Sequence, residues 1–60
     1  MDALQTAQYA RALYTAHGDR AEAEAAQKER ECEAAGNLQE AKDWQAVRQT
    51  IRQMRGPNQA

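Results

Sequence analysis

Large hydrophobic residues recur with helical spacing toward the end of the chain, at Trp44, Val47, Ile51 and Met54. Steps of three, four and three residues place these four side chains on one face of an α-helix. This is the strongest apolar stripe in the sequence. The pattern predicts a helix over residues 38–55 whose apolar face, Trp44 included, forms the core.

A second helical pattern covers residues 3–17. The side predicted to be buried carries Ala3, Ala7, Ala10, Leu13, Tyr14 and His17. Leu4 and Tyr9 lie off that side, so we expect both to be exposed. An exposed pair of this size is typical of a patch that contacts another chain.

The middle of the chain lacks large apolar residues. Residues 18–37 contain no Leu, Ile, Val, Phe, Met, Trp or Tyr. The side predicted to be buried, interrupted at Lys28, carries Ala21, Ala25, Cys32 and Ala35. Alanine is the best helix former, and its small side chain lets neighbouring helices approach closely. We therefore expect a thin alanine layer against the other two helices, with Cys32 as a small buried residue.

Turn residues divide the chain at nearly equal intervals. Asp2, Asp19 and Asn37 are each followed three residues later by Gln or Glu, which is an approximate capping box for a helix start. Glycines stand where the preceding helices should end, at Gly18, Gly36 and Gly56. Glycine adopts a positive φ there without steric penalty. These signals predict three helices, at about 3–17, 20–35 and 38–55.

The two-residue Gly-Asp and Gly-Asn connections favour antiparallel neighbours. The expected fold is therefore all-α, an up-down-up three-helix bundle. A long bent helix followed by a hairpin is the alternative. We expect one small domain over residues 1–55 and a flexible C-terminal tail over 56–60, because Pro57 blocks continuation of the last helix.

The composition argues against catalysis and against a metal or cofactor site. The sequence has no Ser, and Cys32 and His17 are the only residues of their kinds. Antiparallel helices would place these two near opposite ends of the bundle. His17 and Asp19 flank Gly18, but a metal site needs three or four converging ligands. We expect no enzyme activity, no cofactor and no bound metal.

The sequence also gives expectations about the location of the protein and about its net charge. The first ten residues lack the basic start and apolar run of a signal peptide, and one cysteine forms no internal disulfide. No segment approaches the roughly 20 apolar residues that span a bilayer. We expect a cytoplasmic protein without membrane contacts. The net charge of -1 gives no general reason for binding nucleic acid.

Two local charge patterns offer binding hypotheses. Arg48, Arg52 and Arg55 follow a helical i, i+4, i+7 spacing that could bind phosphate, although acidic residues of the antiparallel second helix should lie alongside. Glu31 and Glu33 crowd the end of the second helix, where the helix dipole disfavours negative charge. Such an acidic end is either simply solvated or faces a basic partner.

The turns and the last helix resemble those of short, uncharacterised bacterial helical proteins, which carry an HGD turn, an AGN or AGD turn, and a Trp followed by a Val. The matching residues, within roughly residues 10 to 50, are His17, Gly18, Asp19, Ala35, Gly36, Asn37, Trp44 and Val47. The resemblance implies a helical fold and brings no known activity.

The sequence therefore favours a small non-enzymatic protein-interaction module, such as an accessory regulator or inhibitor of a larger macromolecule. A 60-residue chain has a thin core that a partner or self-association would complete. The candidate partner-binding residues are Glu31, Glu33, Tyr9 and Leu4. The alternatives are a nucleic-acid-associated factor that uses Arg48, Arg52 and Arg55, and a self-associating structural protein.

Overall fold

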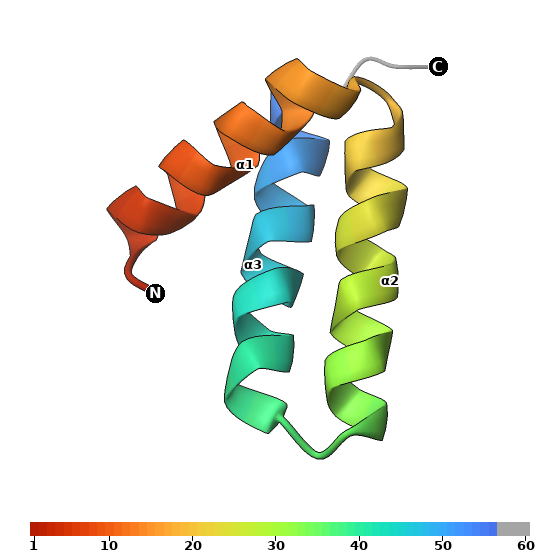
Figure 1. Ribbon diagram of the computed structural model, residues 1–60. Coiled ribbons are helices and arrows are strands. Elements are labelled where there is room, and N and C mark those ends of the chain that lie inside the picture. Colours follow the sequence, from red (N-terminus) through yellow and green to blue (C-terminus); the bar gives the residue numbers. More distant parts are fainter. Residues whose placement is uncertain (57–60) are drawn as a thin grey trace.

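A computed structural model of the chain describes residues 1–56, and they form three helices. These are α1 (Ala3–His17), α2 (Arg20–Ala34) and α3 (Leu38–Met54). The all-α three-helix bundle is confirmed, with helix bounds within one residue of those expected (Figure 1). Residues 57–60, most of the predicted tail, lie outside the described residues.

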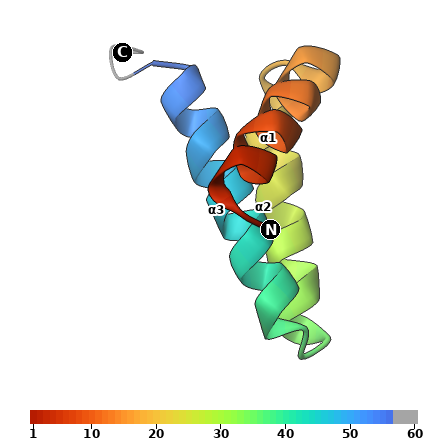
Figure 2. The ribbon, with the colours of Figure 1, turned by 90° about the vertical axis from the view of Figure 1, so that its left-hand side faces the viewer.

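The helices α2 and α3 form a long antiparallel hairpin, and α1 lies across it. Figures 1 and 2 show α1 inclined to the other two helices, with its C-terminal end over the start of α2. The N-terminal end of α1 reaches the middle of α3, where the Met1 ammonium lies 3.5 Å from an Asp43 carboxylate oxygen. The bundle therefore consists of one tight pair and one oblique helix.

The core lies where the three helices meet. It consists of Ala10 from α1, Ala21 and Ala25 from α2, and Val47 and Ile51 from α3. Partly buried side chains pack around this cluster, namely Leu13, Tyr14, Trp44 and Met54. The apolar stripe of the third helix and the alanine layer of the second are therefore confirmed in part, at Val47 and Ile51 and at Ala21 and Ala25. Val47 and Ile51 are the only large side chains that are fully buried among the described residues.

The predicted buried faces need correction at several positions. In α1 the buried residues are Thr6 and Ala10, whereas Ala3, Ala7 and His17 are exposed. Because α1 crosses the hairpin obliquely, only the middle of its inner face touches the other helices. In the hairpin, Cys32 is partly buried, and Ala35 is exposed beyond the end of α2.

One of the three predicted capping boxes forms. The Gln5 amide donates to Asp2 Oδ1 at 2.8 Å, and the Asp2 amide donates to Gln5 Oε1 at 3.2 Å. Neither Asp19 nor Asn37 makes a side-chain cap hydrogen bond. Asp19 has helical backbone angles (φ -63, ψ -17), whereas a capping residue needs an extended backbone.

The turns depend on glycine instead. Gly18 has φ 60, and its amide donates to the Tyr14 carbonyl oxygen at 2.7 Å. Gly36 has φ 83, and the following Asn37 amide donates to the Cys32 carbonyl oxygen at 2.8 Å. Both amides satisfy carbonyl groups left open at a helix end. Positive φ therefore permits the two short reversals that bring the helices together.

Candidate interaction surfaces

Large apolar side chains remain exposed on the N-terminal half of α1. Leu4 is 67% exposed and Tyr9 is 44% exposed, as the sequence predicts. The two residues are five positions apart, which places them about 140° apart around a helix of 3.6 residues per turn. Leu4 and Tyr9 therefore belong to different sides of α1 and do not form one patch.

Tyr9 belongs to an aromatic corner between α1 and α3, which we define as Met1, Tyr9 and Trp44. The rings of Tyr9 and Trp44 meet edge to face, with centroids 5.5 Å apart and planes at 82°. Met1 is 49% exposed, and its ammonium lies 3.5 Å from Oδ1 of Asp43, the residue that precedes Trp44. Edge-to-face pairing is a favourable aromatic geometry, so it fixes both rings in place.

The acidic residues at the end of α2 do not share a face. Glu31 and Glu33 are both exposed, but two helical steps turn their side chains about 160° apart. Glu31 accepts a hydrogen bond from Gln27 Nε2 at 3.2 Å and lies 3.8 Å from Lys28 Nζ. The Glu31 side chain therefore already has partners within α2. The two glutamates do not form one binding site.

Glu40 is the acidic residue that the sequence interpretation missed. It lies in the first turn of α3, and its Oε2 accepts a weak hydrogen bond from Cys32 Sγ at 3.8 Å. Partial burial and the carboxylates of Glu40 and Glu31 raise the pKa of the Cys32 thiol above its ordinary value. The thiol therefore stays protonated at neutral pH and is a poor nucleophile.

The predicted arginine stripe is largely occupied within the hairpin. Arg48 Nε lies 2.9 Å from Glu29 Oε1, and Arg55 Nη1 lies 2.8 Å from Glu22 Oε1. These four partly buried side chains form what we call the ion-pair ladder, with both acids on α2, Arg48 on α3 and Arg55 at the C-cap of α3. Arg52, which lies between the paired arginines, is exposed. Two of the three candidate phosphate-binding residues thus already have carboxylate partners.

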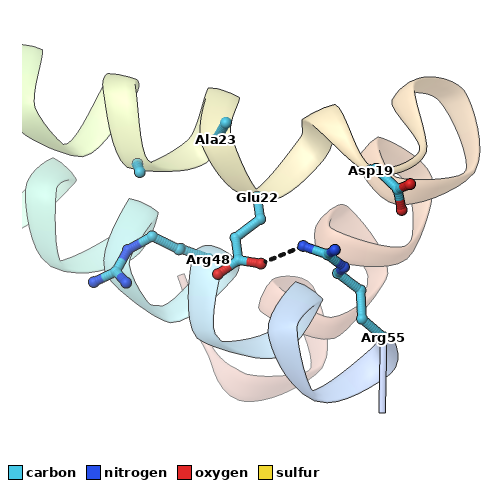
Figure 3. Close-up of a pocket in the computed structure, with 6 residues that line it drawn as sticks. Asp19, Glu22, Ala23, Arg48 and Arg55 are labelled. Atoms are coloured by element: carbon cyan, nitrogen blue, oxygen red, sulfur yellow. Dashed lines mark hydrogen bonds and ion pairs between the residues drawn. The ribbon is translucent and has the colours of Figure 1, made fainter. Parts of the chain in front are cut away.

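A shallow groove of about 300 Å³ lies between α2 and α3 near the Glu22–Arg55 pair of this ladder. It is lined by Asp19, Glu22, Ala23, Ala26, Arg48 and Arg55. Figure 3 shows the Glu22 carboxylate between the two arginine side chains. Arg55 Nε is buried without a hydrogen-bond partner in the part of the chain that the structure describes. The two acidic residues balance the two arginines, so the groove has no net attraction for an anion.

His17 and Cys32, the remaining candidates for catalysis or metal binding, lie far apart. His17 Nδ1 lies 3.1 Å from Glu24 Oε1 on the surface between α1 and α2. Cys32 lies in the last turn of α2, near the other end of the hairpin, as expected. Residues 1–56 contain no group of three or more His, Cys, Asp or Glu side chains that could hold a metal ion.

Comparisons with known protein families, curated proteins and solved structures found no match to this chain. Within residues 1–56, no helix has the length and apolar character that crossing a membrane requires. The function therefore has to be inferred from the residues and contacts described above.

Proposed function

We propose that this chain is a small, non-enzymatic protein-interaction module, which regulates or inhibits a larger protein by binding to its surface. The observation that carries the proposal is the distribution of large apolar side chains. Two are fully buried, whereas four are exposed, and three of those four belong to the first nine residues: Met1, Leu4 and Tyr9. We assign binding to residues 1–9, where Leu4 and Tyr9 offer separate apolar contacts on different sides of α1.

The charge distribution supports this assignment. Residues of α1 include one formally charged side chain, Arg11. The helix α2 has the same length and carries eight, namely Arg20, Glu22, Glu24, Lys28, Glu29, Arg30, Glu31 and Glu33. The buried centre of a protein interface is depleted of charged residues and enriched in Tyr, Trp and Met. Of the two equal helices, α1 has the composition of an interface.

A non-enzymatic role and a cytoplasmic setting fit the rest of the molecule. The thiol of Cys32 forms no disulfide, and partial burial together with the neighbouring Glu40 carboxylate raises its pKa, which keeps the thiol protonated. An unpaired cysteine suits a reducing compartment. Binding of nucleic acid through Arg48, Arg52 and Arg55 is the weaker hypothesis, because the ion-pair ladder neutralises two of these arginines.

The proposal is tested with a photo-crosslinking residue at position 4, and in a second protein at position 30 on the exposed side of α2. Both are used as full-length tagged chains in extract of the source cells, and the crosslinked products are identified by mass spectrometry. We expect one dominant protein to be crosslinked from position 4 and not from position 30. Equal labelling from both positions would contradict the assignment to α1.

Leu38 provides a matched control for Leu4. It is 64% exposed and also lies in the first turn of its helix, but in α3 and not in α1. We expect Leu4→Glu to weaken binding of the captured protein by at least about tenfold, because a charge enters an apolar contact. Leu38→Glu should leave binding unchanged. Equal loss in both variants would overturn the proposal, and binding of DNA or RNA instead of protein would favour the arginine hypothesis.

A further inference from the structure

The connection between α1 and α2 depends on the backbone of one residue. The chain passes from one helix to the other through Gly18 and Asp19 (Figure 1). Asp19 already has helical backbone angles, so only Gly18, with φ 60 and ψ -133, leaves the helical path. With helical angles at Gly18, α1 and α2 would form one helix over residues 3–34. That range contains no proline and no other glycine.

The hydrogen bonds of this turn do little to hold the reversal. The Gly18 amide donates to the carbonyl oxygen of Tyr14, four residues back, as it would in a continuous helix. One bond is specific to the turn, from the Ala21 amide to the Gly18 carbonyl oxygen at 3.0 Å. In the part of the chain that the structure describes, the amides of Asp19 and Arg20 donate to no backbone carbonyl. A continuous helix would give both amides a partner.

The inner faces of the two helices are in phase across the turn. Ala10 and Ala21, both in the core, are eleven positions apart, as are Tyr14 and Ala25. In a helix of 3.6 residues per turn, eleven positions return to within about 20° of the starting direction. A joined helix would therefore carry on one side the residues that α1 and α2 now bury separately.

The helix α1 is held less firmly than the hairpin. Thr6 and Ala10 are its buried residues. Near the turn, His17 lies 3.1 Å from Glu24, but these side chains are 46% and 34% exposed, and exposed ion pairs contribute little. Release of α1 would nevertheless uncover the core around Ile51. That apolar surface would need an equivalent helix to cover it.

We propose that two copies of this chain exchange α1, so that each chain straightens at Gly18 and packs its α1 on the hairpin of the other. The structure shows what the second copy would contact, because its α1 would repeat the contacts made here away from the turn, including the pairing of Tyr9 with Trp44. Exchange of an identical element is a low-cost route to a dimer. The inference goes beyond the proposed function and does not depend on it.

Gly18→Ala tests the exchange. An L-residue is disfavoured at φ 60, whereas alanine favours a continuous helix more than glycine does. The added methyl group would meet nothing within 4 Å, so the substitution acts through the backbone. Together the two preferences favour the straight form by about thirtyfold in each chain. We therefore expect the dimer to tighten by about a thousandfold, measured by sedimentation velocity over a range of concentrations.

Two controls separate this exchange from general loss of stability. Gly36→Ala also places a side chain at positive φ, but within the hairpin, and should not strengthen dimerisation. A synthetic chain with D-alanine at position 18 should dimerise less than the parent chain. D-alanine prefers φ 60 and ψ -133, because these angles mirror the extended region of L-residues.

An NMR measurement identifies the exchanged contact. In Gly18→Ala dimers assembled from isotope-labelled and unlabelled chains, filtered spectra show contacts between chains only. We expect contacts between the rings of Tyr9 and Trp44. A dimer without them would overturn the inference, as would a Gly18→Ala chain that is unfolded at every concentration or dimerises no more strongly than the parent. Equal dimerisation of Gly18→Ala and Gly36→Ala would also overturn it.

Discussion

Single residues of the ion-pair ladder should contribute more to the stability of the fold than exposed ion pairs usually do. The Glu29 side chain is only 15% exposed, and its carboxylate meets Arg48 Nε at 2.9 Å. Removal of one partner leaves the other partly buried charge without compensation. We expect Glu29→Ala to destabilise the fold by about 1 kcal/mol. Glu33→Ala, at an exposed site near the same helix end, should be neutral or slightly stabilising because the helix dipole disfavours an acid there.

Urea unfolding followed by circular dichroism measures both variants. The double variant Glu29→Ala with Arg48→Ala completes a thermodynamic cycle and isolates the interaction between the two side chains. A coupling energy near zero would mean that the ladder does not contribute to stability.

Cys32 gives a second prediction for a single side chain. Because its thiol pKa is raised, a smaller fraction of the thiol is ionised at pH 8 than in an ordinary cysteine. We expect alkylation by iodoacetamide at pH 8 to be slower than for cysteine in an unfolded peptide. Glu40→Gln removes one cause of the rise, so it should lower the pKa and speed the reaction. No difference between the variant and the parent would contradict the role given to Glu40.

Helices and turns were predictable from sequence as far as they depend on neighbours along the chain. The spacing of Val47 and Ile51 and the positive φ of Gly18 and Gly36 are properties of local segments. The oblique crossing of α1 could not be predicted in this way, because it depends on how the surfaces of the three helices pack together. The burial of Thr6 in place of Ala7 follows from that crossing.

The candidate site was less predictable for the same reason. Exposure of Leu4 and Tyr9 follows from helical periodicity within α1. The contact between Tyr9 and Trp44 joins positions 35 residues apart and needs the tertiary structure. Glu40 had no distinguishing pattern in the sequence, since a glutamate in the first turn of a helix is common. Only the hairpin places it beside Cys32.

The turn between α2 and α3 can be tested through Gly36. Its φ of 83 is unfavourable for a residue with a side chain, although a methyl group there would meet nothing within 4 Å. We therefore expect Gly36→Ala to destabilise the fold by about 1 kcal/mol through backbone strain alone. Thermal unfolding measures the loss. An unchanged melting temperature would show that the turn relaxes into another conformation.

For the molecule as a whole, stability depends on very few large side chains. Ile51 and Val47 are fully buried at the centre of a core otherwise built mainly from alanine. Truncation of a buried Ile to Ala costs about 2 to 5 kcal/mol, which is a large part of the stability of so small a domain. We expect Ile51→Ala to be largely unfolded at 37 °C. Leu38→Ala, at a site 64% exposed, should retain its helical circular dichroism spectrum.

A partner that covers the exposed side of α1 would stabilise such a molecule by mass action. The melting temperature should therefore rise when the partner captured through position 4 is added in excess. The same measurement without a partner tests self-association: a melting temperature that rises with protein concentration would favour the structural alternative.

The ion-pair ladder has a consequence for crowded conditions. Glu22 and Glu29 are seven positions apart on α2, and their partners Arg55 and Arg48 are also seven positions apart, on the C-cap and in the helix of α3. Parallel alignment of the two helices would break this register, so the ladder permits only the antiparallel hairpin. Each glutamate at this flank is already paired with an arginine of its own chain. A neighbouring copy that approached the flank would therefore meet carboxylates whose charge is compensated, so the contacts that close the hairpin also reduce the charge available for binding another chain.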